Sequence, residues 1–449
     1  MSDDIVAIKV SGLPLVQDIE KFDVLGVDRV TNQSARASMR QLIKPSLDAA
    51  SAANDAAQRV EELLKHIEEV PDVFGYRYIH GDPDDRVEAI NDIPYDTTGI
   101  APVGSKRKRL LDKMRPYQCN HDGSQREYLQ DDVRLTVGYS NSKLTNPMKL
   151  QMVRVPHFFY RSFDLDEWTY VLFCEIAPEE IGEFMDPEQW KEITPCGYPR
   201  YRGIRKQIDG VWKLLSFSGE YPSVSVTPIN FLAAARNTNP SAITVPYYLY
   251  EAIVFLMTLE LGRHNAQAYY QGITNASTSY AEAAVTGVTD TLVTPSGEVD
   301  VEWQPGSFTK QFRWRFIECV YGQIWNILSG IYYVYDEVND VNRVYITRDP
   351  SKINTNSDYS EYIHVGDTPA VNGYVKKCLP GMIEAAELGG STTTYMADYH
   401  WSSNSATTRI ARSGGTSAIG GLAGPRALNS STSPAGADVS IGAALVLPE

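Results

Sequence analysis

The chain has 449 residues, a formal net charge of −15, and a composition that is 43% hydrophobic and 22% charged. This length exceeds one ordinary core, so we expect two or more domains. An acidic chain lacks the basic face with which proteins displace counterions from DNA or RNA, which argues against a nucleic-acid partner. No apolar run approaches the ~20 residues that span a bilayer, so we expect no membrane insertion.

The five cysteines are widely spaced, and no two of them form a CxxC pair. This pattern favours buried thiols in a reducing compartment over zinc ligands or a disulfide framework. The opening, Met1 to Ile5, is acidic and lacks the basic and apolar segments of a secretory signal. We therefore expect no export by the general route.

The first 70 residues divide into two parts. Residues 1–42 hold two short alternating stretches, too few for an independent core, and are expected to be an attachment segment that docks on a partner. Residues 43–70 are rich in strong helix formers, and Pro71 stops the helix. Their apolar positions recur at alternating threes and fours, which is typical of a coiled-coil seam. The seam residues are Ala50, Ala53, Ala57, Val60, Leu64 and Ile67.

We expect the seam to join copies of this chain, with a trimer preferred. The alternative is one amphipathic helix folded back on its own domain, because the seam lasts only about three heptads.

Residues 71–145 are expected to form a β-rich connector. A strand is predicted over 74–79, and turn chemistry at Asp122-Gly123 predicts a hairpin that joins 114–117 to 128–129. The basic run Lys106 to Arg109 is interpreted as a solvated strand or loop edge. Acidic residues between Asp82 and Asp92 miss the spacing of an EF-hand, so a solvated acidic turn is favoured over a calcium site.

The next part of the chain contains long apolar segments. Strands are predicted over 151–160 and 169–176, and helices over 225–236 and 247–261. Thr227-Pro228 is a start signal for the first helix. The segment 312–331 is predicted as either a helix or a strand–turn–strand.

Polar segments separate these elements. The stretch 272–306 is rich in Ser, Thr and Gly and is predicted to be a long surface insertion, and 351–360 is read in the same way. The tail begins a strand at Ile410, passes through small polar residues and ends on an apolar run at Leu447. We interpret it as two strands joined by a long displayed loop, with the chain finishing inside a sheet.

Four separated segments carry a family resemblance. In order they are Tyr248 to Ala252, Phe316 to Gly330, Arg409 to Gly415, and Ile441 to Ala443. They resemble the C-type-lectin-like fold shared by formylglycine-generating enzymes and phage tropism determinants. In that pattern a Glu-containing helix precedes E-N-x-x-G-N-x-W-x-x-x-x-G, then R-x-x-R-G-G-S-W and a terminal I-G-x-R.

The chain departs from the pattern in three places. Gln323 replaces the usual Asn, Thr416 replaces the Ser-Trp start, and Ala443-Ala444 replaces the final Arg.

Further stretches are similar to virion proteins of tailed phages. They are Met114 to Pro116, Met152 to Tyr160, Ser216 to Gly219 and Leu259 to Gly262. Lys9 to Pro14 looks like the short head of fibre proteins in phages of gut Bacteroidales, including the crAss-like group. The resemblance implies an α+β virion fibre, on head or tail, with a large β-rich C-type-lectin-like domain over 146–449.

That resemblance implies a structural protein of the virion, with no enzymatic activity, no cofactor and no metal. Its partners would be two further copies of itself, capsid or tail proteins bound through the N-terminus, and a host-surface glycan or protein. Carried over by position, the receptor-binding residues are Tyr395, Tyr399, His400, Trp401, Asn404, Arg409, Arg426 and Asn429. For Trp401 a core position is the alternative, because residues two apart on a strand share a face.

Two other functions stay open. One is a purely structural decoration or connector protein of the virion. The other is an enzyme of the formylglycine-generating type, which needs a close pair of reactive cysteines that bind copper, whereas the late cysteines here are Cys319 and Cys378. The sequence also lacks GxSxG, HExxH, P-loop and Rossmann patterns, and Cys119-Asn-His121 lacks the two further ligands that zinc needs.

Overall fold

The fold comes from a computed structural model, which describes residues 72–79, 85, 87–165, 167–178, 189–276, 280–354, 358–391, 396 and 398–449. The attachment segment, the seam from Ala50 to Ile67, and Tyr395 lie outside the described residues. The described part is mostly β with few helices, which confirms an α+β class dominated by strands. No helix in it is long and apolar enough to cross a bilayer.

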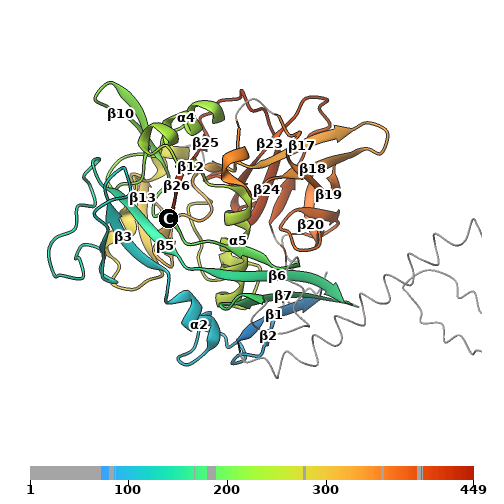
Figure 1. Cartoon of the computed structure of the whole chain (residues 1–449), viewed down its shortest axis with the longest axis horizontal. Coiled ribbons are helices and arrows are strands. Elements are labelled where there is room, and N and C mark those ends of the chain that lie inside the picture. The colour runs from blue at the N-terminus through green and yellow to red at the C-terminus, as the bar shows by residue number, and fades with distance from the viewer. Residues whose placement is uncertain are drawn as a thin grey trace, which may run out of the picture. The chain divides into compact units, whose positions relative to one another are not determined.

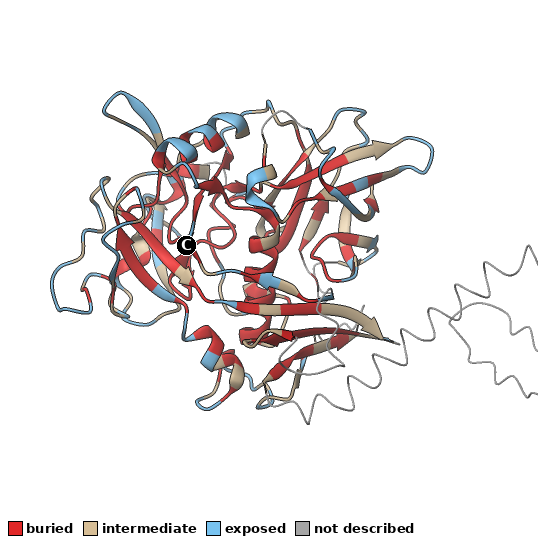
Figure 2. Ribbon diagram, viewed as in Figure 1, coloured by how far each residue is buried: buried red, intermediate tan, exposed pale blue. Residues whose placement is uncertain are grey.

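The helix α5 (Tyr247–Leu261) is the centre of the main core. It is apolar on all sides, and 14 of its 15 residues are buried, as expected for a helix enclosed by other elements. Residues of three sheets pack with it, among them Phe173, Val153 and Leu428. Figure 2 shows this concentration of buried residues, and Figure 1 shows α5 between the sheets.

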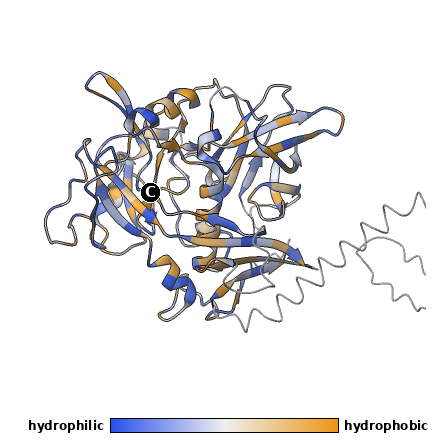
Figure 3. Cartoon of the chain, viewed as in Figure 1, coloured by the Kyte–Doolittle hydropathy of each residue, from blue (hydrophilic) through white to orange (hydrophobic). Residues whose placement is uncertain are grey.

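A five-stranded antiparallel sheet lies against one side of the core. Its strand order is β2 (Val87–Ile90), β1 (Val73–Ile79), β7 (Trp168–Cys174), β6 (Phe158–Leu165) and β8 (Lys191–Ile193). Aromatic residues such as Tyr160 and Phe173 face the core, and on the opposite face Leu172 and Cys174 are buried in a smaller cluster with Trp190. Hydrophobic and hydrophilic residues intermingle along the strands in Figure 3. The strands predicted over 74–79 and 169–176 are confirmed as β1 and β7. The single strand predicted over 151–160 is instead two strands in different sheets, β5 (Leu150–Val155) and β6.

A six-stranded sheet contains the last strand of the chain. Its order is β12 (Ile243–Thr244), β26 (Leu445–Pro448), β9 (Cys196–Pro199), β5 (Leu150–Val155), β3 (Arg115–Cys119) and β4 (Glu127–Tyr128). The pairing of β3 with β4 confirms the predicted hairpin, and β26 confirms that the chain finishes inside a sheet. Residue 146 is the expected start of the lectin-like domain. Strands from before and after it pair with each other in this sheet and in the five-stranded sheet.

A seven-stranded sheet is formed by the later part of the chain. Its order is β21 (Ala385–Leu388), β20 (Gly373–Cys378), β22 (Tyr399–Trp401), β24 (Gly424–Thr432), β23 (Ile410–Gly414), β16 (Trp325–Ile327) and β25 (Ile441–Gly442). The predicted display loop of the tail is wrong, because β24 is the middle strand and eight of its nine residues are buried. Its small polar side chains are buried because they find local partners, as when Ser430 Oγ donates to the carbonyl of Trp401.

Smaller elements complete the fold. They are α2 (Lys106–Leu111), β10 (Ile204–Ile208), β11 (Val211–Leu215), α4 (Pro228–Thr238), β13 (Gly297–Gln304), β14 (Ser307–Trp314), β15 (Ile317–Glu318), β17 (Ile331–Asp336), β18 (Val341–Ile346), β19 (Ile363–Pro369), and short 3₁₀ turns at Ala266–Ala268 (η3), Tyr280–Ala283 (η4), Val288–Thr291 (η5), Pro350–Lys352 (η6) and Gly420–Leu422 (η7). Helix α4 confirms the start signal, since Thr227 Oγ1 caps it by accepting from Asn230 N and Pro228 is its first residue. The segment 312–331 is strand–turn–strand.

The Ser/Thr/Gly-rich stretch 272–306 is not simply a surface insertion. In its described part Ile273, Ala276, Ala283, Ala284 and Val301 form an apolar cluster, and β13 pairs with β14. The buried Glu318 holds η5 in place by accepting from Gly287 N and Thr289 N. Small alanines that pack together, and hydrogen bonds to the distant Glu318 carboxylate, therefore order a segment that its composition alone predicts to be a surface loop.

Two charged stretches also differ from expectation. Lys106 to Arg109 is helix α2, not a strand or loop edge, and its Arg107 is buried against Asp92 at 3.1 Å. Asp92 also accepts from the backbone of Lys106, at the start of that helix. The acidic turn is therefore not fully solvated, because a carboxylate at a helix N-terminus satisfies otherwise unpaired N–H groups.

The loop between β14 and β15 is a two-residue turn, Arg315-Phe316, with φ values of 46° and 68°. Hairpin turns of this kind need left-handed backbone at both positions and usually contain Asn-Gly. Here the turn is fixed by side chains instead. Arg315 pairs with Glu260, and Phe316 is buried at the edge of a cavity of about 470 Å³ that Lys108 and Arg115 also line.

Candidate functional site

A line of aromatic side chains crosses one face of the seven-stranded sheet. Tyr374 of β20 is paired in register with Tyr399 of β22, and their ring centroids are 4.9 Å apart. The Tyr399 ring lies 4.7 Å from that of Trp401, which meets Trp325 of β16 edge-on at 5.1 Å. Tilted and edge-to-face contacts are the favourable geometries for aromatic rings. We call Tyr374, Tyr399, Trp401 and Trp325 the aromatic row.

The aromatic row occupies the face of this sheet that points away from α5, which we call the outer face. Trp325 is buried on this face in a second apolar cluster, and Trp401 packs against that cluster. Leu428, Ala411 and Val375 belong to the core that contains α5, so their face is the inner one. Because side chains alternate along a strand, Tyr399 and Trp401 share the outer face, and both are half-buried. Trp401 is thus both a packing residue, through its contact with Trp325, and partly open to solvent.

Polar groups lie between the rings. Asn429 of β24 pairs in register with Trp401 on one side and with Arg412 of β23 on the other. The Asn429 amide oxygen accepts from Ser431 N and Ser431 Oγ at 2.9 and 2.7 Å. The Arg412 guanidinium lies 5.0 Å from the Trp325 ring centroid, in a cation–π contact.

The structure separates the predicted receptor-binding residues. Tyr399 and Trp401 lie in the aromatic row, and Asn404 is exposed in the loop that follows β22. Arg409 is half-buried, and its Nη2 donates to Ser405 Oγ at 2.5 Å. Of these four, only Tyr399 and Trp401 are brought together, because Arg409 forms an isolated bridge with Tyr333 just before β23.

The predictions for His400, Arg426 and Asn429 are corrected by their burial, since each is at most 4% exposed. His400 points inward from β22, with Nε2 3.4 Å from Thr368 Oγ1, and burial lowers its pKa to about 4. Arg426 is on the central strand β24, and its backbone N donates to Asp398 at 2.6 Å. A receptor cannot reach side chains enclosed in this way.

Three residues of the site are not among those that the family resemblance implied by position. They are Tyr374, Trp325 and Arg412. Trp325 and Arg412 lie in two of the segments that carry the family resemblance, so the signal was present. Their convergence depends on strand register, which brings Trp325, Arg412 and Trp401 together from three strands. Sequence alone does not provide that register.

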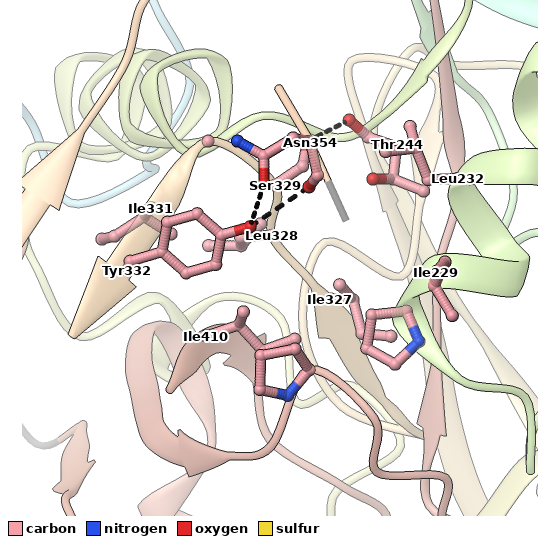
Figure 4. A pocket seen from close by; sticks show the side chains of 13 residues that line it. Ile229, Leu232, Thr244, Ile327, Leu328, Ser329, Ile331, Tyr332, Asn354 and Ile410 are labelled. Atoms are coloured by element: carbon pink, nitrogen blue, oxygen red, sulfur yellow. Dashed lines mark hydrogen bonds between the residues drawn. The ribbon is translucent and has the colours of Figure 1, made fainter. Parts of the chain in front are cut away.

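A small apolar pocket lies between α4, β16 and β17 (Figure 4). Ile229, Leu232, Ile327 and Ile410 are among the residues that line it, and Tyr332 Oη donates to Asn354 Oδ1 at 3.1 Å. Its volume is about 30 Å³, which is room for a water molecule and far less than a sugar ring requires. The pocket is therefore a packing defect, and not a ligand site.

The chemistry of the other groups is that of a packed interior. All five cysteines are buried free thiols, and burial raises the pKa of Cys378 to about 11. A thiol held protonated at neutral pH is a poor nucleophile and metal ligand. Among the described residues, no three His, Cys, Asp or Glu side chains are grouped so as to hold a metal ion.

No protein-family model and no curated protein matches the sequence of this chain.

Proposed function

We propose that this chain recognises a saccharide through the aromatic row, as the distal domain of a tailed-phage virion fibre. The observation that carries the proposal is the half-buried pair Tyr399 and Trp401, held rigidly by Tyr374 and Trp325 on one face of a sheet. A sugar ring has an apolar C–H face that stacks on an aromatic ring, and hydroxyl groups that need polar partners at the rim. The row offers both, because Ser431 lies beside Asn429 on β24, and the exposed Asn404 follows Trp401 by three residues along the chain.

Rigid aromatic residues suit recognition because they give contact area at a low cost in conformational entropy. Trp401 is pre-ordered by its edge-on contact with Trp325, so little further ordering is needed on binding. The fibre part of the proposal is supported by the order of the sequence, in which an attachment segment and a self-associating seam precede the β-rich domain. Several linked copies would raise the apparent affinity by about 10² to 10⁴ over one weak site.

Replacing Trp401 by alanine is expected to weaken binding to a saccharide ligand by about 30-fold, the effect of removing a central aromatic contact worth about 2 kcal/mol. Tyr399→Ala is expected to act in the same direction. A glycan array identifies ligands of the wild-type protein, and titration calorimetry measures the affinity of each variant.

Trp212→Ala is the matched control, because Trp212 is an exposed tryptophan on β11 that makes no contact with the aromatic row. Wild-type affinity in Trp401→Ala, at an unchanged melting temperature, would remove the aromatic row as the binding site. Failure to bind any glycan, with normal incorporation into particles, would favour the purely structural role of a decoration or connector protein.

A trimer is expected for the full chain in solution, held by the seam from Ala50 to Ile67. Light scattering measures its mass, and Leu64→Lys with Ile67→Lys is expected to release monomers because charge at seam positions opposes helix association. Val338→Lys is the control, since Val338 is exposed in the β17–β18 turn and lies far along the chain from the seam. A monomeric wild-type chain would contradict the fibre part of the proposal.

A further inference from the structure

Arg412 has an unusual position within the aromatic row. It projects from β23 on the outer face, between Asn429 and Ile327 of the neighbouring strands, and it is half-buried. Its guanidinium lies over the Trp325 ring, which in turn meets Trp401. A positive charge therefore lies beside the contact between Trp325 and Trp401, next to the face on which we propose that a sugar binds.

Apart from the Trp325 ring, the guanidinium has no hydrogen-bond acceptor and no ion-pair partner in the part of the chain that the structure describes. Its Nε is buried without a hydrogen bond, and neither a hydrogen bond nor an ion pair links its other nitrogens to a described residue. Asp438 is near enough to favour the charge electrostatically, but it is not within ion-pair distance. One Asp438 oxygen is occupied by Ser440, which donates both N–H and hydroxyl to it.

A buried Nε without a hydrogen bond is not peculiar to Arg412, since Arg107 and Arg426 share it. What distinguishes Arg412 from several interior arginines is that its other nitrogens also lack protein acceptors. Arg107, Arg200 and Arg315 each pair with a carboxylate, and Arg313 donates to several backbone carbonyls. A partly buried guanidinium without acceptors lowers the stability of the folded state, because burial penalises its charge and leaves a buried N–H donor without a hydrogen bond. In agreement, burial lowers the pKa of Arg412 to about 10.

We infer that Arg412 binds the carboxylate of an acidic sugar whose ring stacks on Trp401, an inference that rests on the proposed recognition of a saccharide. A planar guanidinium offers two parallel N–H donors that match the two oxygens of a carboxylate. The Trp325 ring beside the guanidinium shields that pair from water on one side, which strengthens it. A chain of net charge −15 repels anions at long range, so a local cation is what admits an acidic ligand.

The inference gives the ligand class as uronic acids and related carboxylated sugars. A neutral sugar would offer Arg412 only hydroxyl oxygens, which accept weaker hydrogen bonds than a carboxylate does, so the site should favour the acid. Since hydrogen bonds between charged groups are the stronger ones, the acidic sugar should bind about 10-fold or more tightly than its neutral counterpart.

The test pairs each uronic-acid oligosaccharide with its carboxyl-reduced form, in which –COOH has become –CH₂OH. Affinities of the wild-type protein for both forms are measured by titration calorimetry. We expect about a 10-fold preference for the acid in wild type, loss of this preference in Arg412→Gln, and partial retention in Arg412→Lys, which keeps the charge without the planar pair of donors. Asp438→Asn is expected to keep the preference, because Asp438 is not the group that the ligand contacts.

The outcomes separate the two levels of the proposal. Equal wild-type affinity for acidic and reduced forms overturns the role of Arg412 but leaves saccharide recognition standing. Absence of binding to either form overturns both. Because the main comparison uses two ligands on one unmodified protein, it does not depend on how well the variants fold.

Discussion

Glu260→Ala is expected to lower the free energy of unfolding by about 3–5 kcal/mol, the usual cost of leaving one charge of a buried ion pair alone. Glu260 lies near the end of α5 and is 6% exposed. Its carboxylate accepts from Arg315 Nε and Nη2 at 2.9 and 2.5 Å and from Trp314 Nε1 at 2.7 Å. The substitution therefore leaves these three N–H donors without their acceptor.

The substitution has a second effect, because Glu260 also fixes the turn at Arg315-Phe316 through Arg315. Left-handed backbone at a residue other than glycine costs about 1–2 kcal/mol per residue, and side-chain contacts must offset it. Without Glu260 the Arg315 side chain keeps only Asp112 as a charged partner, at the rim of the neighbouring cavity. The turn and the packing of Phe316 should loosen together.

Chemical denaturation of the variants measures this effect. Glu361→Ala is the control, since Glu361 is exposed and its contact with Lys352 is long at 4.0 Å, so a change within about 0.5 kcal/mol is expected. Adding Arg315→Gly to Glu260→Ala should restore part of the lost stability, because the unpaired charge is removed and glycine accepts left-handed backbone. If Glu260→Ala and Glu361→Ala were equally stable, the buried pair would not be holding the turn.

The elements that the sequence predicted best are those whose signals are local. Thr227 and Pro228 mark a helix start by capping chemistry that involves only neighbouring residues, and α4 begins there. Helix α5 is a continuous apolar segment that a flanking proline and glycine delimit. The hairpin of β3 and β4 follows from its Asp-Gly turn. None of these inferences needed a distant partner.

The inferences that were wrong concern burial decided by distant partners. Arg107 is interior because Asp92 and a helix N-terminus meet it, and no pattern along the chain shows that. The small polar residues of β24 read as a loop, yet the strand is central because β22 and β23 pair with both of its edges. The same limit explains the candidate site, since Trp401 could be predicted as a contact residue whereas its neighbour Trp325 could not.

The free energy of unfolding is expected to fall as pH rises from about 5 to 8, and Glu384 is the main cause. Its side chain is fully buried at the edge of β21, where Oε1 accepts from Tyr333 Oη at 2.7 Å and Oε2 has no partner. Burial, with a smaller contribution from the nearby Glu251, raises the pKa of Glu384 to about 8. Burial also raises the pKa of Asp398 and of Glu318 to about 7.

The direction follows from proton binding. A glutamic acid in the unfolded chain loses its proton near pH 4.5, whereas the folded chain keeps the proton on Glu384 up to about pH 8. Below pH 4.5 Glu384 is protonated in both the folded and the unfolded chain, and its contribution to the free energy of unfolding is fully present. Between the two values the folded state holds more protons than the unfolded state, so stability declines with rising pH, by as much as about 5 kcal/mol from this group.

Urea denaturation at pH 5, 6, 7 and 8 measures the slope, and Glu384→Gln is expected to flatten it, because an amide stays neutral throughout and can still accept from Tyr333. Glu387→Gln is the matched control: Glu387 lies on β21, three residues beyond Glu384, is exposed beside Lys376, and its substitution removes one charge of the same sign. General repulsion in an acidic chain would change the slope equally in both variants. Asp398 and Glu318 should leave a smaller slope in this variant. A slope in Glu384→Gln equal to that of the wild type would show that the Glu384 carboxyl ionises freely in the folded state and that the interior around Tyr333 admits water.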